Sequence, residues 1–196
     1  MPRVSDAHRA SRRDQILDAA LECFAQRGVR ATTMADIIAA SGLSAGAIYG
    51  YFEGKQELAL AVMRRVVAGR SADVDAAAGV RPPSPGGILR ALNDGFIREG
   101  IDPSILVQLW GEAANDPEFH EIARRAFGAV EGMFATHLGR WATTARGMDP
   151  AAGAAWAIRM VPVLLGLAQG LIVQETILPG FDREAFLAAV DEVFHE

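Results

Sequence analysis

The chain has 196 residues, enough for a buried core in one large or two small domains, and its net charge of −5 would by itself argue against a nucleic-acid partner. The charge is unevenly divided, however. Residues 1–70 carry ten Lys and Arg against seven Asp and Glu (net +3), and residues 71–196 carry nine against seventeen (net −8). A basic first third on an acidic remainder suits a protein that offers one end to DNA, although an imbalance of this size also arises by chance.

No segment has the pattern of a signal peptide or a membrane span. Residues 1–13 are polar and arginine-rich, and we expect residues 1–11 to form a flexible arm. The most apolar stretch, Met160 to Val173, is fourteen residues long and is interrupted by Pro162 and Gln169, which fits a buried core helix. The single cysteine, Cys23, cannot form an internal disulfide. We therefore expect a cytoplasmic protein with no membrane partner.

The first third of the chain predicts three helices. An apolar stripe including Ile16 and Phe24 predicts a helix from about Arg12 to Arg27, ended by Gly28. Two short helices follow within residues 33–55. Thr33 and Ser44 are suited to cap their N-termini, and Gly42 to end the first of them. Two helices joined by a tight turn that contains glycine form a helix-turn-helix, whose second helix enters the DNA major groove.

The rest of the chain also predicts helices. A fourth begins near Lys55 and runs to about residue 75, and the proline-rich segment 79–87 forms a loop. A helix over about 87–99 follows. Three Asp-Pro pairs mark further helix starts, because aspartate caps a helix and its first position tolerates proline. They predict helices over about 103–114, 117–143 and 150–175, and a last helix is capped by Asp182. With no alternating β-branched run, the chain is predicted to be all-α, with about nine helices.

The segment from Thr33 to Leu58 resembles the signature of the TetR family of bacterial transcriptional regulators. The resemblance rests on Gly42-Leu43-Ser44 and on the tail Tyr51-Phe52-x-x-Lys55 at its spacing from Gly42. It implies a three-helix DNA-binding head over 12–57 and an effector-binding and dimerisation body over 58–196. It implies that the residues in contact with a duplex operator are Thr33, Ser44, Ala45, Gly46, Ala47, Tyr49, Gly50, Tyr51 and Lys55.

The family roles carry over residue by residue. Thr33 and Ser44 would meet phosphates and Lys55 would neutralise one, while Ala45 to Ala47 would face the groove floor. Tyr49 would reach a base edge or a phosphate, and Tyr51 the DNA backbone. The small residues at 45 and 50 depart from the long or polar ones common in the family. We therefore expect modest direct readout of bases and more weight on phosphates and DNA shape.

The two last long helices predict a dimer interface. The 150–175 helix is apolar nearly all round, so one side can pack on its own body while the other meets a partner. Two glycines one turn apart allow close approach, although packing within one chain is the alternative. The predicted interface residues are Gly166, Gly170, Phe186 and Val190. A two-fold axis makes the operator a palindrome.

The resemblance also implies an effector pocket in the body, and the residues favour an apolar or aromatic effector. Each candidate is also suited to plain core packing. Arg159 stands out because a buried guanidinium among apolar neighbours needs an anion, although a salt bridge or an exposed position would serve as well. The candidates are Met63, Phe96, Trp110, Met133, His137, Trp156, Arg159 and Met160.

Two other functions are possible for an all-α chain. An all-α enzyme needs a catalytic constellation, but the four histidines are scattered and no metal or phosphate motif is present. The acids between Glu112 and Glu121 fit helix-start acids better than a metal site. We therefore expect no catalytic residues, no cofactor and no bound metal. The second alternative keeps the DNA-binding dimer but makes its body only a dimerisation or protein-docking platform. The resemblance favours a repressor that a small effector releases from its operator.

Overall fold

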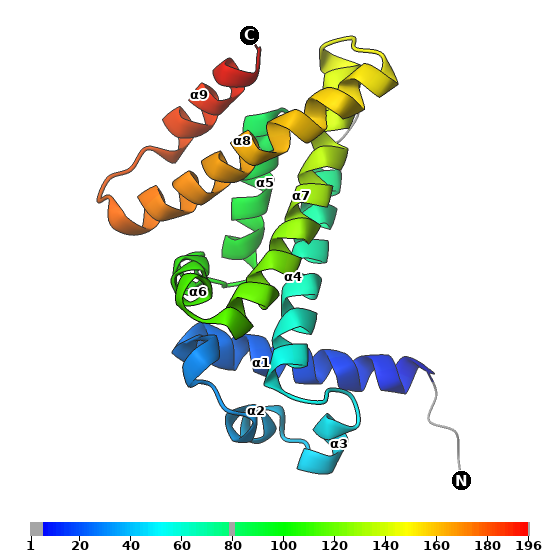
Figure 1. The fold of residues 1–196 in the computed structure, drawn as a ribbon, viewed down its shortest axis with the longest axis vertical. Coiled ribbons are helices and arrows are strands. Elements are labelled where there is room, and N and C mark those ends of the chain that lie inside the picture. Colours follow the sequence, from blue (N-terminus) through cyan, green and yellow to red (C-terminus); the bar gives the residue numbers. More distant parts are fainter. Residues whose placement is uncertain (1–5, 79–80, 196) are drawn as a thin grey trace. The chain divides into compact units, whose positions relative to one another are not determined.

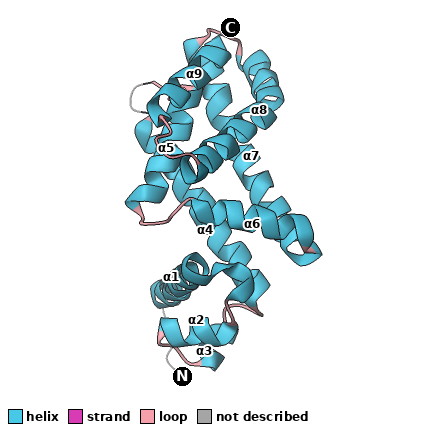
Figure 2. Ribbon diagram, turned by 90° about the vertical axis from the view of Figure 1, so that its left-hand side faces the viewer, coloured by secondary structure: helices cyan, strands magenta, loops and turns pink. Residues whose placement is uncertain are grey.

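The structure is a computed structural model that describes residues 6–78 and 81–195. In this part of the chain every regular element is a helix (Figures 1 and 2), so the all-α prediction is confirmed. The helices are α1 (Asp6–Ala31), α2 (Met34–Ser41), α3 (Ala45–Tyr49), α4 (Lys55–Ala77), α5 (Pro85–Arg98), α6 (Ser104–Asn115), α7 (Pro117–Ala145), α8 (Pro150–Ile177) and α9 (Arg183–His195).

Two of the three Asp-Pro pairs have the predicted aspartate cap, although α6 begins at Ser104, one residue after its proline. The carboxylate of Asp149 accepts hydrogen bonds from the amides of Ala151 (2.9 Å) and Ala152 (3.1 Å) at the start of α8. The carboxylate of Asp102 likewise accepts from the amide of Ser104 at 2.8 Å. Proline fits beside each cap, because the first turn of a helix leaves its amides without partners in any case.

Two predicted boundaries were wrong. Helix α1 begins at Asp6, so residues 6–11 of the expected flexible arm are helical, and residues 1–5 lie outside the described part. The flexible arm was expected because this segment is polar and rich in arginine. Arginine and alanine are also good helix formers, so a polar sequence is equally compatible with an exposed helix. Helix α5 begins at Pro85, because Ser84 caps it by accepting from the amide of Gly87 at 3.1 Å. Residues 79 and 80 of the expected loop lie outside the described residues.

The chain divides into two compact units, each with its own core. The first consists of Met1–Arg65 and Gln108–Arg125, and the second of Val66–Val107 and Ala126–Glu196. Ile16, Ile37 and Ile48 are fully buried in the first unit. In the second unit Phe134 and Leu138 are fully buried in a cluster formed by α4, α5, α7, α8 and α9. The domain boundary predicted after residue 57 stays a prediction.

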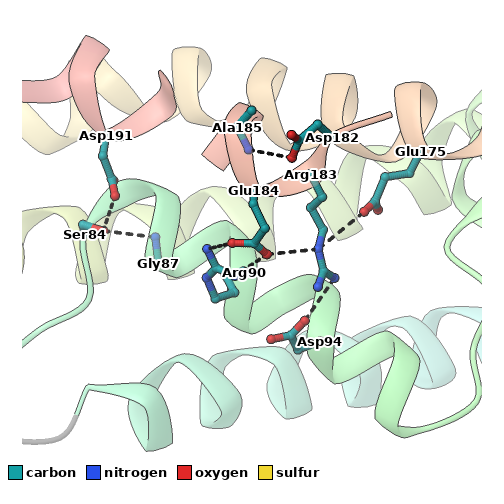
Figure 3. A network of polar contacts seen from close by, with 10 residues as sticks. All are labelled: Ser84, Gly87, Arg90, Asp94, Glu175, Asp182, Arg183, Glu184, Ala185 and Asp191. Atoms are coloured by element: carbon teal, nitrogen blue, oxygen red, sulfur yellow. Dashed lines mark hydrogen bonds and ion pairs between the residues drawn. The ribbon is translucent and has the colours of Figure 1, made fainter. Parts of the chain in front are cut away.

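In the second unit, α9 supplies a cap to the start of α5 (Figure 3). The carboxylate of Asp191 accepts from the hydroxyl of Ser84 at 2.8 Å. It also accepts from the amide of Gly86 at 2.6 Å. Ser84 and Asp191 therefore satisfy the first amides of α5 together, from two different helices. A glycine is required at position 86, because a methyl group there would collide with the backbone carbonyl of Leu187.

Ion pairs extend this contact along α5 (Figure 3). The guanidinium of Arg90 binds both carboxylate oxygens of Glu184, which lowers the pKa of Glu184. Arg183 is 3.1 Å from the carboxylate of Asp94 on α5 and 3.8 Å from that of Glu175 on α8. Because these ion pairs are exposed or half-exposed, they orient α9 against its neighbouring helices more than they stabilise the fold.

We predict that Gly86→Ala destabilises the protein by about 1–3 kcal/mol, because α9 must move away from α5. The control is Gly128→Ala in α7, where an added methyl group meets nothing within 4 Å. That change should stabilise by up to about 1 kcal/mol, because alanine is the better helix former. Thermal unfolding followed by circular dichroism measures both. Equal stability of the two variants would contradict the close α5–α9 contact.

Candidate nucleic-acid interface

Helix α2 begins with a capping box. The amide of Asp36 donates to the Thr33 hydroxyl oxygen at 3.2 Å, and the amide of Thr33 donates to the Asp36 carboxylate at 2.8 Å. The hydroxyl of Thr33 also donates to that carboxylate, at 2.7 Å. These hydrogen bonds from Thr33, with the nearby Arg27 guanidinium, lower the pKa of Asp36. The hydroxyl proton of Thr33 is thus already engaged, and its predicted phosphate contact requires the hydroxyl to turn away from Asp36.

The turn between α2 and α3 follows the predicted pattern. Gly42 ends α2 in the left-handed conformation, at φ 67° and ψ 14°, where glycine avoids the steric cost of a side chain. The hydroxyl of Ser41 accepts from the amide of Leu43 at 3.2 Å. Ser44 then caps α3, and its hydroxyl accepts from the amide of Ala47 at 3.2 Å. Two helices joined by a three-residue turn result (Figure 1).

Helix α3 turns one side chain into the protein and the others outward. Ile48 is fully buried, whereas 52% of Tyr49 is exposed. Tyr51, just beyond the helix, is half-buried. The residues exposed on and beside the helix are Ser44, Ala45, Gly46, Ala47, Tyr49 and Gly50. The predicted DNA-facing positions of α3 therefore form one accessible surface with few bulky side chains.

Lys55 has a structural contact that the sequence did not reveal. Its ammonium Nζ donates to the backbone carbonyls of Arg30 and Thr32, each at 3.0 Å. It thereby joins the first residue of α4 to the end of α1. An ammonium carries three protons, so one donor remains for the predicted phosphate contact. The sequence feature that could have revealed this contact is Gly28, at which the sequence predicts the end of a helix. The carbonyls at a helix end need hydrogen-bond donors from elsewhere in the chain.

A second contact fixes α1 against the helix-turn-helix. The side-chain amide of Gln15 donates to the carbonyl of Ser41, the last residue of α2, at 2.8 Å. The fully buried Thr32 holds the other end of α1, since its hydroxyl lies 2.8 Å from the carbonyl of Gly28 and 3.1 Å from that of Cys23. Polar side chains thus tie the ends of α1, α2 and α4 together within the first unit.

The predicted dimer residues are only partly accessible. Gly166 is exposed, and an added side chain there would meet nothing within 4 Å, while Gly170 is half-buried. Phe186 is half-buried against the ring of Phe181, at 5.7 Å between centroids. Val190 is a correction, because it is only 2% exposed and packs in the core of its own unit. The sequence showed that α9 is amphipathic but not which partner its apolar face meets.

Helices α8 and α9 nevertheless carry exposed apolar side chains. They are Ile158, Val163 and Ile177 in α8 and Val193 in α9. Helix α8 is long and apolar enough to cross a membrane by length and composition, a property shared by core helices of soluble proteins. Only 28% of its most apolar window is buried. Much of this surface is therefore open to a partner.

The predicted effector residues are divided between the two units, with Met63 and Trp110 in the first and the other six in the second. Met133 and His137 lie in the core of the second unit, and burial lowers the pKa of His137. Phe96 is buried beneath the guanidinium of Arg70, at 4.9 Å from Cζ to the ring centroid. Trp156 packs on Trp141, at 5.8 Å between ring centroids. These side chains mostly fill space in the core.

Arg159 takes the exposed position that the sequence left open. It is exposed, and its guanidinium donates to the carbonyl of Ala155 on its own helix at 3.2 Å. It shares an exposed face with Ile158 and Val163, so apolar neighbours in the sequence did not mean burial. Met160 is half-buried against the core, whereas Met63 and Trp110 are half-buried in the first unit.

An open groove of about 690 Å³ lies on the second unit, away from all eight predicted effector residues. Its polar lining includes Arg81, Arg140 and Thr143, and its apolar lining includes Ala154 and Ile158. Arg140 is also paired with Asp75 at 2.7 Å. The sequence offered no signal for this groove, because its lining joins short stretches of α7 and α8 with Ala78, Arg81 and Pro82.

Glu121, one of the acidic residues near the start of α7, forms ion pairs within its own helix. Arg124 and Arg125 bind the carboxylate of Glu121, at 2.8 and 2.6 Å, and these hydrogen bonds lower its pKa to about 2. Among the side chains that the structure describes, which do not include those of Glu112 and Glu118, no three acidic, histidine or cysteine residues are placed to hold a metal ion.

Comparison with known proteins points to one family. Residues 16–62 match the profile of bacterial regulatory proteins, tetR family. The HTH-type transcriptional repressor Rv1474c of Mycobacterium tuberculosis is 45% identical over 64 residues, which cover 33% of this chain and 34% of that protein. The HTH-type transcriptional repressor AcnR of Corynebacterium diphtheriae is 39% identical over 80 residues, covering 41% and 42%. The matched segments thus span less than half the length of these relatives.

The fold extends the similarity to nearly the whole chain. A TetR-family regulator from Syntrophomonas wolfei has a TM-score of 0.71 at 15% identity, covering 95% of this chain and 94% of that one. Reduced NemR of Escherichia coli has a TM-score of 0.68 at 17% identity, covering 93% and 97%. At such identities the likeness concerns the fold alone.

We predict that Lys55→Met lowers the free energy of unfolding by about 1–3 kcal/mol, because two backbone carbonyls lose their donor. The control is Arg64→Met, an exposed position on the same helix, which should change stability by no more than about 0.5 kcal/mol. Chemical denaturation of the DNA-free protein measures both. If the two variants unfold alike, the lysine does not hold the end of α1.

Proposed function

We propose that this chain, which belongs to the TetR family of bacterial regulators, is a DNA-binding transcriptional regulator that lays α3 in the major groove of an operator. The observation that carries the proposal is the orientation of α3. Ile48 is fully buried beneath it, while Ala45, Gly46, Ala47 and Tyr49 are exposed. A helix held by one face and open along the other is what a duplex requires of a recognition helix.

The chemistry of that surface determines how it would read DNA. Alanine and glycine let the helix approach the bases closely, and methyl groups can contact thymine methyls. Tyr49 is the one large exposed side chain of α3 and is placed for a base edge or a phosphate. Because so few side chains can form paired hydrogen bonds to bases, phosphate contacts and DNA shape carry much of the recognition. Ser44 at the helix N-terminus and the remaining donor of Lys55 supply such phosphate contacts.

We propose further that the protein acts as a homodimer through α8 and α9. The support is the exposed apolar surface that includes Ile158, Val163 and Val193, together with the open position at Gly166. Burying such a surface against a second copy removes it from water. A two-fold axis spaces the recognition helices by about one turn of DNA, roughly 34 Å, and makes the operator a palindrome.

The regulator is proposed to be a cytoplasmic repressor that an apolar or aromatic effector releases. Both Rv1474c and AcnR are named repressors, which supports repression here. Release requires that the effector prefer DNA-free protein, typically by about 1–3 kcal/mol. Equal effector affinity with and without operator excludes this coupling.

One observation favours the alternative of a body that only dimerises. Met133 and His137, two of the predicted effector residues, are buried in the second unit, where Met133 packs in the hydrophobic core. A regulator of this kind would bind its operator with the same affinity in every small-molecule mixture tested.

Selection from a library of random duplexes tests the central proposal. The purified full chain should enrich a palindrome with half-sites about 10 base pairs apart. Its affinity should fall steeply as salt rises, because phosphate contacts release counterions. If no duplex is retained even at low ionic strength, the proposed function is wrong.

A charged residue at position 166 tests the dimer. We expect the mass in light scattering to be twice 20.9 kDa for the natural chain and 20.9 kDa for Gly166→Arg. The fold should survive, because a side chain at 166 meets nothing within 4 Å in its own chain. Gly111→Arg, at an equally open position in α6, should remain dimeric. A dimeric Gly166→Arg protein would remove this interface.

A further inference from the structure

Two arginines in the first half of α1, Arg12 and Arg13, form no ion pair with the side chains that the structure describes. Elsewhere in the first unit, Arg27 pairs with Asp36 at 2.7 Å and Arg65 with Asp18 at 2.8 Å. Arg12 and Arg13 have no carboxylate within ion-pair distance among the described residues. Both nevertheless have defined partners: Gln15, which binds the last residue of α2 shortly before α3, and Phe52, which follows α3.

Arg12 lies near the beginning of α3. Its guanidinium donates to the side-chain oxygen of Gln15 at 2.8 Å, and the nitrogen of the same amide donates to the carbonyl of Ser41 at 2.8 Å. Ser41 ends α2, and Ser44 caps α3 three residues later. A single amide group therefore separates the charge of Arg12 from the turn that leads into α3.

Arg13 lies near the other end of α3. Its guanidinium carbon Cζ is 5.5 Å from the ring centroid of Phe52. Phe52 is only 3% exposed, and its amide donates to the carbonyl of Ile48 at 3.1 Å, so it closes the turn that follows α3. The ring holds the guanidinium by a cation–π contact and leaves its N–H groups free, because that contact uses the flat face of the cation.

A helix in the major groove has a row of phosphates on each side, since the groove is only about 12 Å wide. Cations held beside α3 can therefore reach phosphates that border the groove. We propose that Arg12 and Arg13 bind such DNA phosphates and so fix the position of α3 in the groove. This inference rests on the proposed function and extends the DNA-contacting surface to α1, outside the segment from Thr33 to Lys55.

The assignment also gives Gln15 and Phe52 a second role. Each positions a guanidinium and is itself held by the backbone of the helix-turn-helix, Gln15 at Ser41 and Phe52 at Ile48. The phosphate contacts are thus set in register with α3 before DNA arrives. Such preorganisation avoids the entropy cost of ordering two long side chains on binding.

The salt dependence of binding tests the proposal. Fluorescence anisotropy with one duplex of about 30 base pairs, the sequence most enriched by the selection, gives the affinity at several NaCl concentrations. Arg12→Gln and Arg13→Gln should each reduce the slope of log affinity against log salt by about 0.9 for each phosphate that is no longer neutralised, or about twice that when both heads bind. Their base preference in the random-duplex selection should stay unchanged.

Three controls make the outcome decisive. Arg64→Gln, at an exposed position on α4, should keep the natural slope, and Arg13→Lys should retain most of it. Unfolding curves of each variant show whether the head is intact. If the natural chain binds DNA and the Arg12 and Arg13 variants match the slope of Arg64→Gln, this inference is wrong and the proposed function stands. If the natural chain binds no duplex, both are wrong.

Discussion

The burial of Ile48 is the constraint on which the proposed interface depends. Helix α3 has five residues, far fewer than an isolated helix needs to be stable in water. Its conformation must therefore come from packing and caps. Ile48 is fully buried, and successive residues of a helix are about 100° apart, so this one contact decides which residues face outward. If the helix rotated by one residue, Tyr49 would turn inward and the small outer surface would disappear.

The rest of the DNA-binding head supports the packing around Ile48 through polar contacts at the ends of its helices. Lys55 binds the last carbonyls of α1, Gln15 binds the last carbonyl of α2, and Asp36 completes the cap of α2. All three satisfy backbone groups that a helix cannot satisfy by itself. Because the contacts of Lys55 and Gln15 join different helices, they fix the angles between helices as well as their ends, whereas Asp36 acts within α2.

The sequence predicted helix starts and turns well, but it predicted poorly what the faces of the helices pack against. Asp149 and Gly42 act within a few residues of themselves, so the helix start and the turn that they set were predicted correctly. The side chain of Val190 was misplaced, because an apolar pattern does not reveal whether a helix face meets its own core or a partner. The contact of Lys55 with Arg30 joins residues 25 apart, and no local pattern encodes it. The exposed positions of α3 were expected from the family motif, and their contacts with DNA stay a prediction.

Residue-resolved hydrogen exchange of the free protein tests the central claim most directly. The amides of Ile48, Gly50 and Phe52 donate to carbonyls within or next to α3. If α3 is held as one unit with the head, these amides should be protected as strongly as those of the buried core residues Ile16 and Ile37. If they exchange as fast as an unstructured peptide while Ile16 stays protected, α3 is not a preformed reading surface, and the account is contradicted.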